Sequence, residues 1–268
     1  MISVVLATHN EERNLTACLK SVQPWAGEVV VVDGSSTDDT PELAERLGAR
    51  VIKTTNKANF HINKQQAMNQ AKGQLVLQLD ADEVVDDQLA EFIQKIARQL
   101  DQTTPKAWII DQPAAWWVRR KNFFMGKFLG KGGQYPDPVI RLYINGYARL
   151  PQKDVHEQMA VTGTTAWAEG HLLHYSNPSF KDYLLKFNRY TSFKARQLRA
   201  EHLKINLINS WRYLIWKPKL TFLQLFFRHK GFVDGVPGFV FALMSGLHHP
   251  VAYLKLWELY HRQQGKHD

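Results

Sequence analysis

Four short strand-like runs, most of them apolar, are separated by helical patterns in the first part of this 268-residue chain. The runs cover residues 1–7, 28–32, 50–53 and 74–79, and apolar side chains recur between them at helical spacing, as at Leu15, Leu19 and Val22. Strands that lack polar alternation and alternate with helices indicate a parallel sheet covered on both faces. The sequence therefore predicts an α/β fold, in which ligands bind beyond the carboxyl ends of the strands.

Polar side chains follow three of the four predicted strands. They are Thr8, Asn10 and Glu11 after the first strand, Asp33 and Ser35 after the second, and Asp80 and Asp82 after the fourth. Each loop alone is also ordinary turn or helix-cap chemistry. Their joint placement at one sheet edge predicts a nucleotide site. No Gly-x-Gly-x-x-Gly follows the first strand, which argues against a dinucleotide site of the usual kind.

The segment Asp80-Ala81-Asp82-Glu83 ends the fourth predicted strand with a cluster of carboxylates. An extended chain points residues i and i+2 to the same side, so Asp80 and Asp82 are expected to face one spot. Carboxylate oxygens there suit Mg²⁺ or Mn²⁺. The alternative is that these residues only favour the start of the helix near Asp86.

Three segments together resemble the family 2 glycosyltransferases of the GT-A fold: residues 4–12, residues 31–38 and the Asp-x-Asp segment 79–83. Within that family the chain is most similar to bacterial lipopolysaccharide-core β-glucosyltransferases. Those enzymes share the Asp-Ala-Asp-Glu form and a later Val-His-Glu, which is Val155-His156-Glu157 in this sequence.

The resemblance implies a Rossmann-like, mixed but mainly parallel sheet flanked by helices, and a metal-dependent, inverting transfer from a nucleotide-diphosphate sugar, most simply a UDP-hexose. It implies that Asp33 reads the nucleobase with help from residues 8–11. Asp80 is expected near the ribose or the metal, and Asp82 as a ligand of Mn²⁺ or Mg²⁺. Lys64 is expected to contact the diphosphate or the base, the alternative being a solvated helix face.

An inverting transfer also needs a base for the acceptor hydroxyl, downstream of the metal motif. The candidates are Asp137, Asp154, His156 and Glu157. Glu157 is preferred because it fits the Val-His-Glu of the family, with Asp154 and Asp137 behind it. His156 is assigned to the acceptor or diphosphate, or else to packing. The alternative for Asp154 and Glu157 is that they are exposed loop carboxylates. A strand at residues 139–143, a turn at Asn145-Gly146 and a return strand at residues 147–150 predict a hairpin that presents the base.

Two further residues and one segment are candidates for the site. Arg141 lies in a predicted strand, where an arginine is unusual unless it is paired, and is expected to face the acceptor or a phosphate. His174 is expected near the diphosphate or metal, or else as a core histidine. The segment 108–135 is rich in aromatic residues and glycine, which suits an acceptor-side loop.

The last third of the chain is helical by pattern. The expected organisation is a catalytic domain at residues 1–178, with a nucleotide half 1–100 and an acceptor half 101–178, followed by an amphipathic helical region 179–268. Apolar helices are predicted at residues 205–216, 220–227, 232–247 and 251–260, edged by Lys and Arg. The uncharged stretch 235–247 is shorter than the ~20 residues of a spanning helix. The pattern indicates helices that lie on an anionic membrane surface. Core packing or a homo-oligomer seam is the alternative.

Charge and cysteine content indicate the binding partners and the cellular location. The formal charge of +9 fits an anionic membrane, and the dispersed Lys and Arg residues without a binding motif argue against nucleic acid. The lone Cys18 and the lack of a secretory signal predict a cytoplasmic enzyme, peripheral on the inner face of the cell membrane. Two other functions stay open: a transferase for a soluble or protein acceptor, and a non-catalytic scaffold that binds sugar nucleotides.

Overall fold

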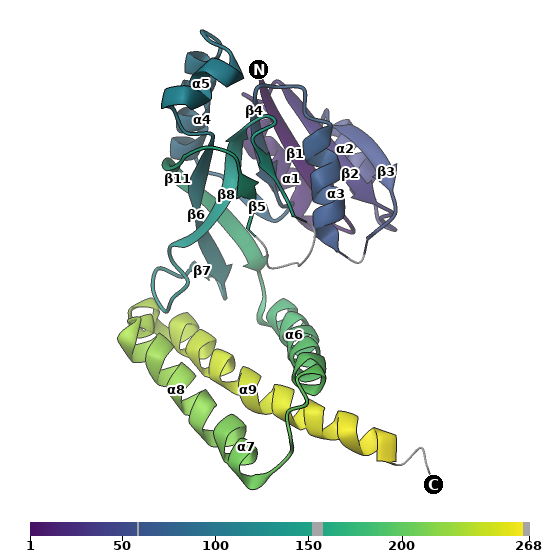
Figure 1. The fold of residues 1–268 in the computed structure, drawn as a ribbon, viewed down its shortest axis with the longest axis vertical. Helices are drawn as coiled ribbons and strands as arrows, with labels where there is room; N and C mark the ends of the chain where they lie inside the picture. The colour runs from purple at the N-terminus through teal and green to yellow at the C-terminus, as the bar shows by residue number, and fades with distance from the viewer. Residues whose placement is uncertain (58, 152–157, 265–268) are drawn as a thin grey trace. The chain divides into compact units, whose positions relative to one another are not determined.

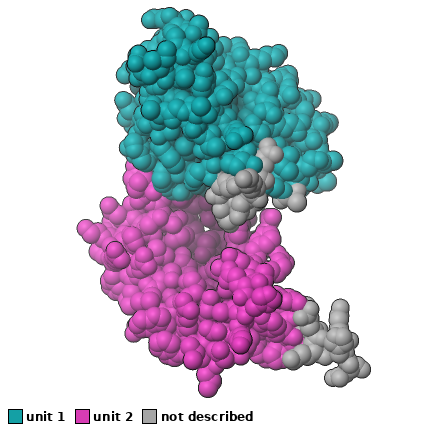
Figure 2. Space-filling model, viewed as in Figure 1, with its two compact units in different colours: residues 1–121, 137–174 teal, residues 122–136, 175–268 magenta. Residues whose placement is uncertain are grey.

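The computed structural model describes residues 1–57, 59–151 and 158–264 (Figure 1). The chain divides into two compact units (Figure 2). Unit 1 comprises residues 1–121 and 137–174, and unit 2 comprises residues 122–136 and 175–268. This division differs from the predicted boundary at residue 178 mainly because it groups the segment 122–136 with the C-terminal helices.

The first half of unit 1 is a parallel sheet, as predicted. Its strands are β1 (Ile2–Thr8), β2 (Glu28–Gly34), β3 (Arg50–Thr54) and β4 (Leu75–Leu79), in the order β3-β2-β1-β4. The helices of this unit are α1 (Glu12–Val22), α2 (Thr40–Arg46), α3 (Phe60–Asn69), α4 (Asp87–Leu100) and α5 (Pro105–Asp111). The four strand-like runs of the sequence are therefore the four parallel strands.

The other half of the sheet makes it mixed. Strand β8 (Asp137–Ile144) pairs antiparallel with β4, and β6 (Ala115–Phe124) pairs antiparallel with β8. The order continues through β11 (Thr165–Asn177) to β5 (Glu83–Val85), and β7 (Lys127–Phe128) pairs with β6. Strand β5 begins directly after the Asp80-Ala81-Asp82 segment and is the last strand in this order.

The predicted hairpin between residues 139–143 and 147–150 is wrong in its pairing. Gly146 has φ +87°, as the turn requires. The strand after the turn, β9 (Ala148–Arg149), pairs with β10 (Ala160–Val161) in a separate two-stranded sheet. The physical reason is that β8 already has β4 on one side and β6 on the other, so it offers no free edge.

Alternate residues of the parallel strands pack on opposite faces of the sheet. Val4 and Leu6 belong to one core cluster, which includes Leu15 of α1 and Ile93 of α4. Val5 of the same strand belongs to a second cluster, which includes Ala67 and Met68 of α3. This period of two explains why the strands read as continuous apolar runs, since both faces are covered by helices.

Unit 2 contains the C-terminal helices. They are α6 (Phe180–Ala200), a continuous helical run 207–228, the short η3 (Gly231–Asp234) and α9 (Gly235–Gln264). The run 207–228 consists of α7 (Leu207–Trp211), the π-helical turn η1 (Arg212–Trp216), α8 (Lys217–Leu223) and the π-helical turn η2 (Gln224–Arg228). The π-helical turn η1 comes just before Pro218, which has no N–H to donate to the preceding turn.

Helix α9 is one continuous helix, which corrects the prediction of two helices separated near Pro250. A proline inside a helix costs about 3 kcal/mol or more, because one intrahelical hydrogen bond is lost. Packing of α9 on both α6 and α8 outweighs that cost. Residues 231–261 are, by length and composition alone, long and apolar enough to cross a membrane, so the expected limit of residues 235–247 was too short.

The inserted segment 122–136 is held to the C-terminal helices within unit 2. The backbone N–H groups of Gly130 and Lys131 donate to the carboxylate of Asp234, at 3.0 and 2.8 Å. The ring of Phe124 lies 5.0 Å from that of Tyr183 in α6 and 5.8 Å from that of Phe241 in α9. The glycine-rich segment therefore uses its backbone amides to bind a carboxylate of its own chain.

Candidate active site

The three polar strand ends lie side by side at one edge of the sheet. Strand β1 is central, with Thr8 opposite Asp33 of β2 and Leu6 opposite Leu79 of β4. Because these strands are parallel, the loops that follow them leave from the same edge. The predicted convergence of the first, second and fourth strand ends is therefore present in unit 1.

Asp33 organises the end of β2. Its carboxylate is almost fully buried and accepts hydrogen bonds from the Ser36 backbone N–H at 2.9 Å, the Ser36 hydroxyl at 2.5 Å and the Thr8 hydroxyl at 3.2 Å. Three donors around one buried carboxylate fix its orientation. The first and second strand ends are thus bonded to each other through Thr8 and Asp33.

Both loops place a non-glycine residue in the left-handed region, Asn10 at φ +57° and Ser35 at φ +59°. The Asn10 side chain accepts from the Thr37 backbone N–H at 2.8 Å, and the Ser35 hydroxyl donates to the Thr54 carbonyl at 2.7 Å. Such conformations cost about 1–3 kcal/mol each and persist where the surroundings determine them. Here these side-chain hydrogen bonds hold the two bends.

A pocket of about 380 Å³ opens beside the end of β2. Its lining includes Asp33, Ser35, Ser36, Lys53 and Thr54. Pockets that bind small molecules typically measure about 300–1,000 Å³. Two of the residues predicted to bind the nucleotide therefore line a pocket of suitable size.

Glu11, also predicted at the nucleotide, is turned toward its own helix. Its backbone N–H donates to the Thr40 hydroxyl at 2.8 Å, and its carboxylate accepts from the Asn14 side chain at 2.8 Å. These contacts join the start of α1 to the start of α2, so Glu11 helps to fix the first loop against the second.

Asp80 is held by two cations. Arg141 donates to one carboxylate oxygen at 2.5 Å, and the Lys64 ammonium group pairs with the other oxygen. Burial by itself would raise the pKa of the Asp80 carboxyl, but Arg141 and Lys64 outweigh it and hold the pKa well below its usual value. Lys64 is itself buried, so its side chain does not lie on a solvated helix face.

Glu83 and Arg120 extend this network and were missed in the sequence. The Glu83 side chain is fully buried and accepts from Arg141 at 2.9 Å, from Arg120 at 3.4 Å and from the Asp80 backbone N–H at 2.9 Å. A carboxylate at the start of β5 with no solvent exposure is tolerated because two guanidinium groups face it. In the sequence, Arg141 stands out as a lone charge among apolar strand residues, whereas Arg120 lies in a run of polar residues and gives no such signal.

Asp82 lies next to His174, with 3.4 Å between a carboxylate oxygen and Nε2. Strands β5 and β11 bring them together, because His174 is opposite Glu83 in the register. Among the described residues, no group of three or more His, Cys, Asp and Glu side chains is arranged to hold a metal. The pair offers one carboxylate and one imidazole, and both side chains are partly exposed.

The preferred base candidates Glu157, Asp154 and His156 lie outside the described residues. The remaining candidate, Asp137, pairs with Arg120 at 2.7 Å. Its carboxylate is therefore engaged in an ion pair with a guanidinium group. The geometry of the described residues therefore leaves the choice of Glu157 as a prediction.

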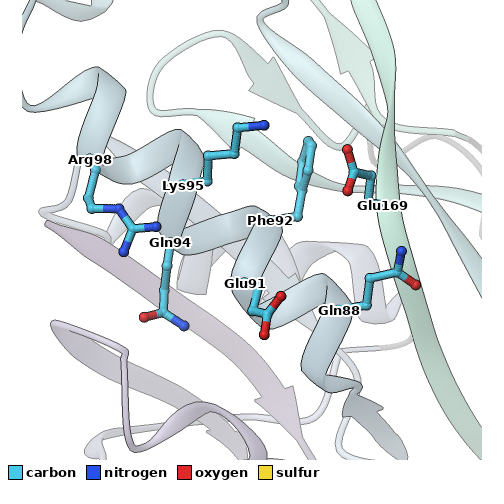
Figure 3. Close-up of a pocket in the computed structure, with 7 residues that line it drawn as sticks. All are labelled: Gln88, Glu91, Phe92, Gln94, Lys95, Arg98 and Glu169. Carbon is cyan, nitrogen blue, oxygen red and sulfur yellow. The ribbon is translucent and has the colours of Figure 1, made fainter.

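A second depression of about 310 Å³ lies on α4 (Figure 3). It is lined by Gln88, Glu91, Phe92, Gln94, Lys95, Arg98 and, from β11, Glu169. None of the side chains predicted for the nucleotide or metal lines it. The polar strand ends, and not this depression, therefore form the candidate active site.

The chain is similar to known proteins over most of its length. Residues 3–163, which hold all three strand-end loops, match the model of glycosyl transferase family 2. An uncharacterized glycosyltransferase of Rickettsia typhi is 28% identical over 267 residues, covering 96% of this chain and 87% of the relative. The lipopolysaccharide core biosynthesis glycosyltransferase LpsC of Rhizobium meliloti is 28% identical over 273 residues, covering 97% and 92%.

Among solved structures, S. aureus TarS 1-349 in complex with UDP is similar to this chain at 18% identity and a TM-score of 0.48, over 88% of this chain and 75% of that one. The mixed sheet covered by helices is the GT-A architecture implied by the resemblance. The family model matches more than half of the chain, and the chain therefore belongs to glycosyl transferase family 2.

Proposed function

We propose that this glycosyltransferase moves a sugar from a nucleotide-diphosphate sugar, most simply a UDP-hexose, to a lipid-linked or lipopolysaccharide-core acceptor. The observation that carries the proposal is the arrangement of the strand ends, where the Asp33 pocket and the Asp80–Asp82 segment flank β1 on its two sides. The name of the LpsC relative supports the class of acceptor.

The nucleotide half of the donor suits the pocket at the end of β2. A uracil ring presents an N–H between two carbonyl groups, and the pocket offers a carboxylate at Asp33 and a hydroxyl at Ser35. Asp80 is expected to bind the ribose hydroxyls through the hydrogen-bond acceptor sites of its carboxylate that Lys64 and Arg141 do not use. Thr8 and Asn10 set the shape of the neighbouring loop.

Asp82 and His174 would hold Mn²⁺ or Mg²⁺, with the diphosphate of the donor completing the coordination. One carboxylate and one imidazole fit Mn²⁺ in particular, since it accepts both oxygen and nitrogen ligands. Such an ion would supply Lewis-acid chemistry at the leaving diphosphate. Lys64, paired with Asp80, adds a positive charge at the same edge of the sheet.

Glu157 is the proposed base that accepts the proton of the acceptor hydroxyl, with Asp154 as the alternative and His156 as a contact to the acceptor or diphosphate. Direct displacement by the acceptor inverts the configuration at the sugar carbon, so one base suffices. Arg141 acts indirectly in this proposal, because its guanidinium is bound by Asp80 and Glu83 and orients Asp80. The reaction is assigned to the inner face of the cell membrane.

A binding experiment tests the donor site. The unfolding midpoint is followed with a panel of sugar nucleotides and Mn²⁺, and UDP-hexoses are expected to give the largest rise. Asp33→Asn should weaken UDP about tenfold or more and leave pyrophosphate with Mn²⁺ unchanged, because only UDP carries the base. Asp39→Asn on the rim is the matched control. Equal loss of UDP and pyrophosphate would contradict base recognition by Asp33.

A further inference from the structure

Unit 2 combines a large exposed apolar surface with a strong positive charge. Of the 27 large apolar side chains that are exposed among the described residues, 22 lie in this unit. By sequence, unit 2 has 17 Lys and Arg against 5 Asp and Glu, a formal charge of +12, whereas unit 1 has 17 against 20, a charge of −3. Most of the basic residues of unit 2 therefore have no acidic partner within it.

The exposed apolar side chains of α9 form a single stripe, named here the α9 stripe: Val236, Phe239, Leu243, Leu247, Leu254 and Trp257. Their spacing of three or four residues, or seven across Pro250, places them along one side of the helix. The opposite side is buried and small, with Gly238, Ala242 and Gly246. A Cβ on Gly246 would come within 2.8 Å of the Pro218 carbonyl oxygen, so α9 packs closely on α8.

The run 207–228 beside α9 presents a second exposed apolar face, which includes Ile208, Trp211, Ile215, Leu220, Leu223 and Phe227. In Figure 1, α8 and α9 lie side by side, and their contacts are extensive. Exposed tryptophans occur on both, with 54% of Trp211 and 47% of Trp257 accessible. Tryptophan and basic residues together are typical of helices at a membrane surface.

The charged residues of the same helices decide whether this surface lies flat on a bilayer or crosses it. The Lys255 ammonium group donates to Asn188, Thr191 and Ser192 of α6 at 2.6–2.8 Å, which ties the second half of α9 to α6. Helix α6 carries six Lys and Arg residues, and Arg228 and Lys230 are exposed at the turn before α9. A charge at the bilayer centre costs at least about 2.5–3.5 kcal/mol. Crossing would therefore bury charges that lying flat leaves in water.

We propose that unit 2 binds an anionic lipid bilayer in the plane of its surface, with the α9 stripe and the apolar face of residues 207–228 in the lipid and the basic side chains at the headgroups. The inference deepens the proposed function, because a lipid-linked acceptor is found at that surface. The formal charge of +12 favours an anionic bilayer over a second copy of this chain, since two such units repel each other.

Vesicle flotation of the purified full-length protein tests the proposal. Binding is expected to be strong for phosphatidylcholine mixed with phosphatidylglycerol, about tenfold or more weaker for phosphatidylcholine alone, and reduced by salt. The double variant Phe239→Ser with Leu243→Ser should lose about tenfold or more of its binding to the anionic vesicles. Ile110→Ser, an exposed apolar position of unit 1, is the matched control and should bind normally.

The contribution of positive charge to vesicle binding is tested with two further double variants. Lys219→Gln with Arg228→Gln should weaken binding to anionic vesicles and leave the weak binding to phosphatidylcholine unchanged. Lys20→Gln with Lys106→Gln removes two exposed charges from unit 1 and should have little effect. Equal binding of the wild-type protein to both vesicle types would overturn the role of charge.

Three results would overturn the in-plane arrangement. Retention in vesicles after alkaline carbonate extraction would show a spanning helix. Dissociation of a dimer by Phe239→Ser with Leu243→Ser, with vesicle binding unchanged, would show a contact between copies. Absence of fluorescence quenching by brominated lipid in the wild-type protein would show that Trp211 and Trp257 stay in water, and this measurement needs no variant. UDP affinity is recorded in parallel, so failure of the donor site is distinguished from failure of membrane binding.

Discussion

Arg141 and Glu83 form an ion pair beneath the Asp-x-Asp segment, with 2.9 Å between Nη2 and Oε1 and no solvent exposure of the carboxylate. The same guanidinium nitrogen donates to Asp80, and the other oxygen of Glu83 accepts from the Asp80 backbone N–H. The first aspartate of the motif is therefore held from its side chain and from its backbone by one buried pair.

Glu83→Gln should lower the free energy of unfolding by about 3 kcal/mol, because the buried Arg141 and the partly buried Arg120 lose their shared negative charge. Chemical denaturation at neutral pH measures the change. Glu169→Gln, an exposed carboxylate on β11, is the control and should change the stability by less than about 1 kcal/mol. A loss in Glu83→Gln as small as in the control would mean that the pair adds nothing to the fold.

Asp82→Ala should abolish the Mn²⁺-dependent part of the affinity for UDP, since the proposed ion would lose its carboxylate ligand. Calorimetric titration of UDP with and without Mn²⁺ measures it. Asp87→Ala removes an exposed carboxylate from the first turn of α4 and should retain the full metal effect. Metal-dependent UDP affinity that survives in Asp82→Ala would move the metal elsewhere.

Lys64→Gln should weaken UDP about tenfold or more, because the positive charge beside Asp80 is lost. Lys64→Arg keeps the charge and should retain most of the affinity. The same titration without metal separates this effect from that of Asp82. Equal affinities in the two variants would show that the charge of Lys64 plays no part in donor binding.

Glu157→Gln should leave UDP affinity unchanged and lower the rate of transfer by about 10²–10⁴-fold, as expected for a lost general base. The rate is measured as UDP release with a lipopolysaccharide-core lipid as acceptor. Asp154→Asn is measured alongside, and the larger loss identifies the base. Normal turnover in both variants would assign the proton transfer to another group.

The stability of unit 2 should depend on His249 in mildly acidic solution. Burial, reinforced by the nearby positive charge of Lys217, lowers the pKa of His249 from 6.5 to about 4. Between these values the unfolded chain binds a proton that the folded chain does not, so the free energy of unfolding falls as pH drops from 6.5 toward 4. After discounting for partial exposure of the ring, the loss is about 1–2 kcal/mol.

His249→Gln should remove that part of the pH dependence, whereas His229→Gln, at an exposed turn position, should keep it. Thermal unfolding between pH 4 and pH 7 measures both. An unchanged slope in His249→Gln would assign the acid sensitivity to other groups.

The parallel half of the sheet and its functional edge were predictable because local patterns encode them. Strands β1, β2 and β4 contain continuous apolar runs, and the ends of these three strands carry the polar residues within a few positions. The Asp80–Arg141 and Glu83–Arg120 contacts were not predictable, since they join residues far apart in sequence. Only the register of β4, β8 and β6 brings them together.

The errors have a common origin in reading local breaks as structural ends. Asn145-Gly146 does form a turn, but the partner of the following strand depends on which edges of β8 are already occupied. Pro250 resembles a helix end, yet α9 continues through it because neighbouring helices support both of its halves. The residues around each break do not encode the strand partner or the continuation of the helix.

The hydrogen bonds that the amides of Gly130 and Lys131 donate to Asp234 join parts of the chain that lie more than a hundred residues apart. The C-terminal helices and the inserted segment are thus one folding module encoded in two pieces. A chimera that exchanges only residues 175–268 with those of a relative would replace Asp234 and leave the amides of Gly130 and Lys131 beside a foreign helix. Successful exchange of acceptor or lipid preference would require residues 122–136 to travel with the helices.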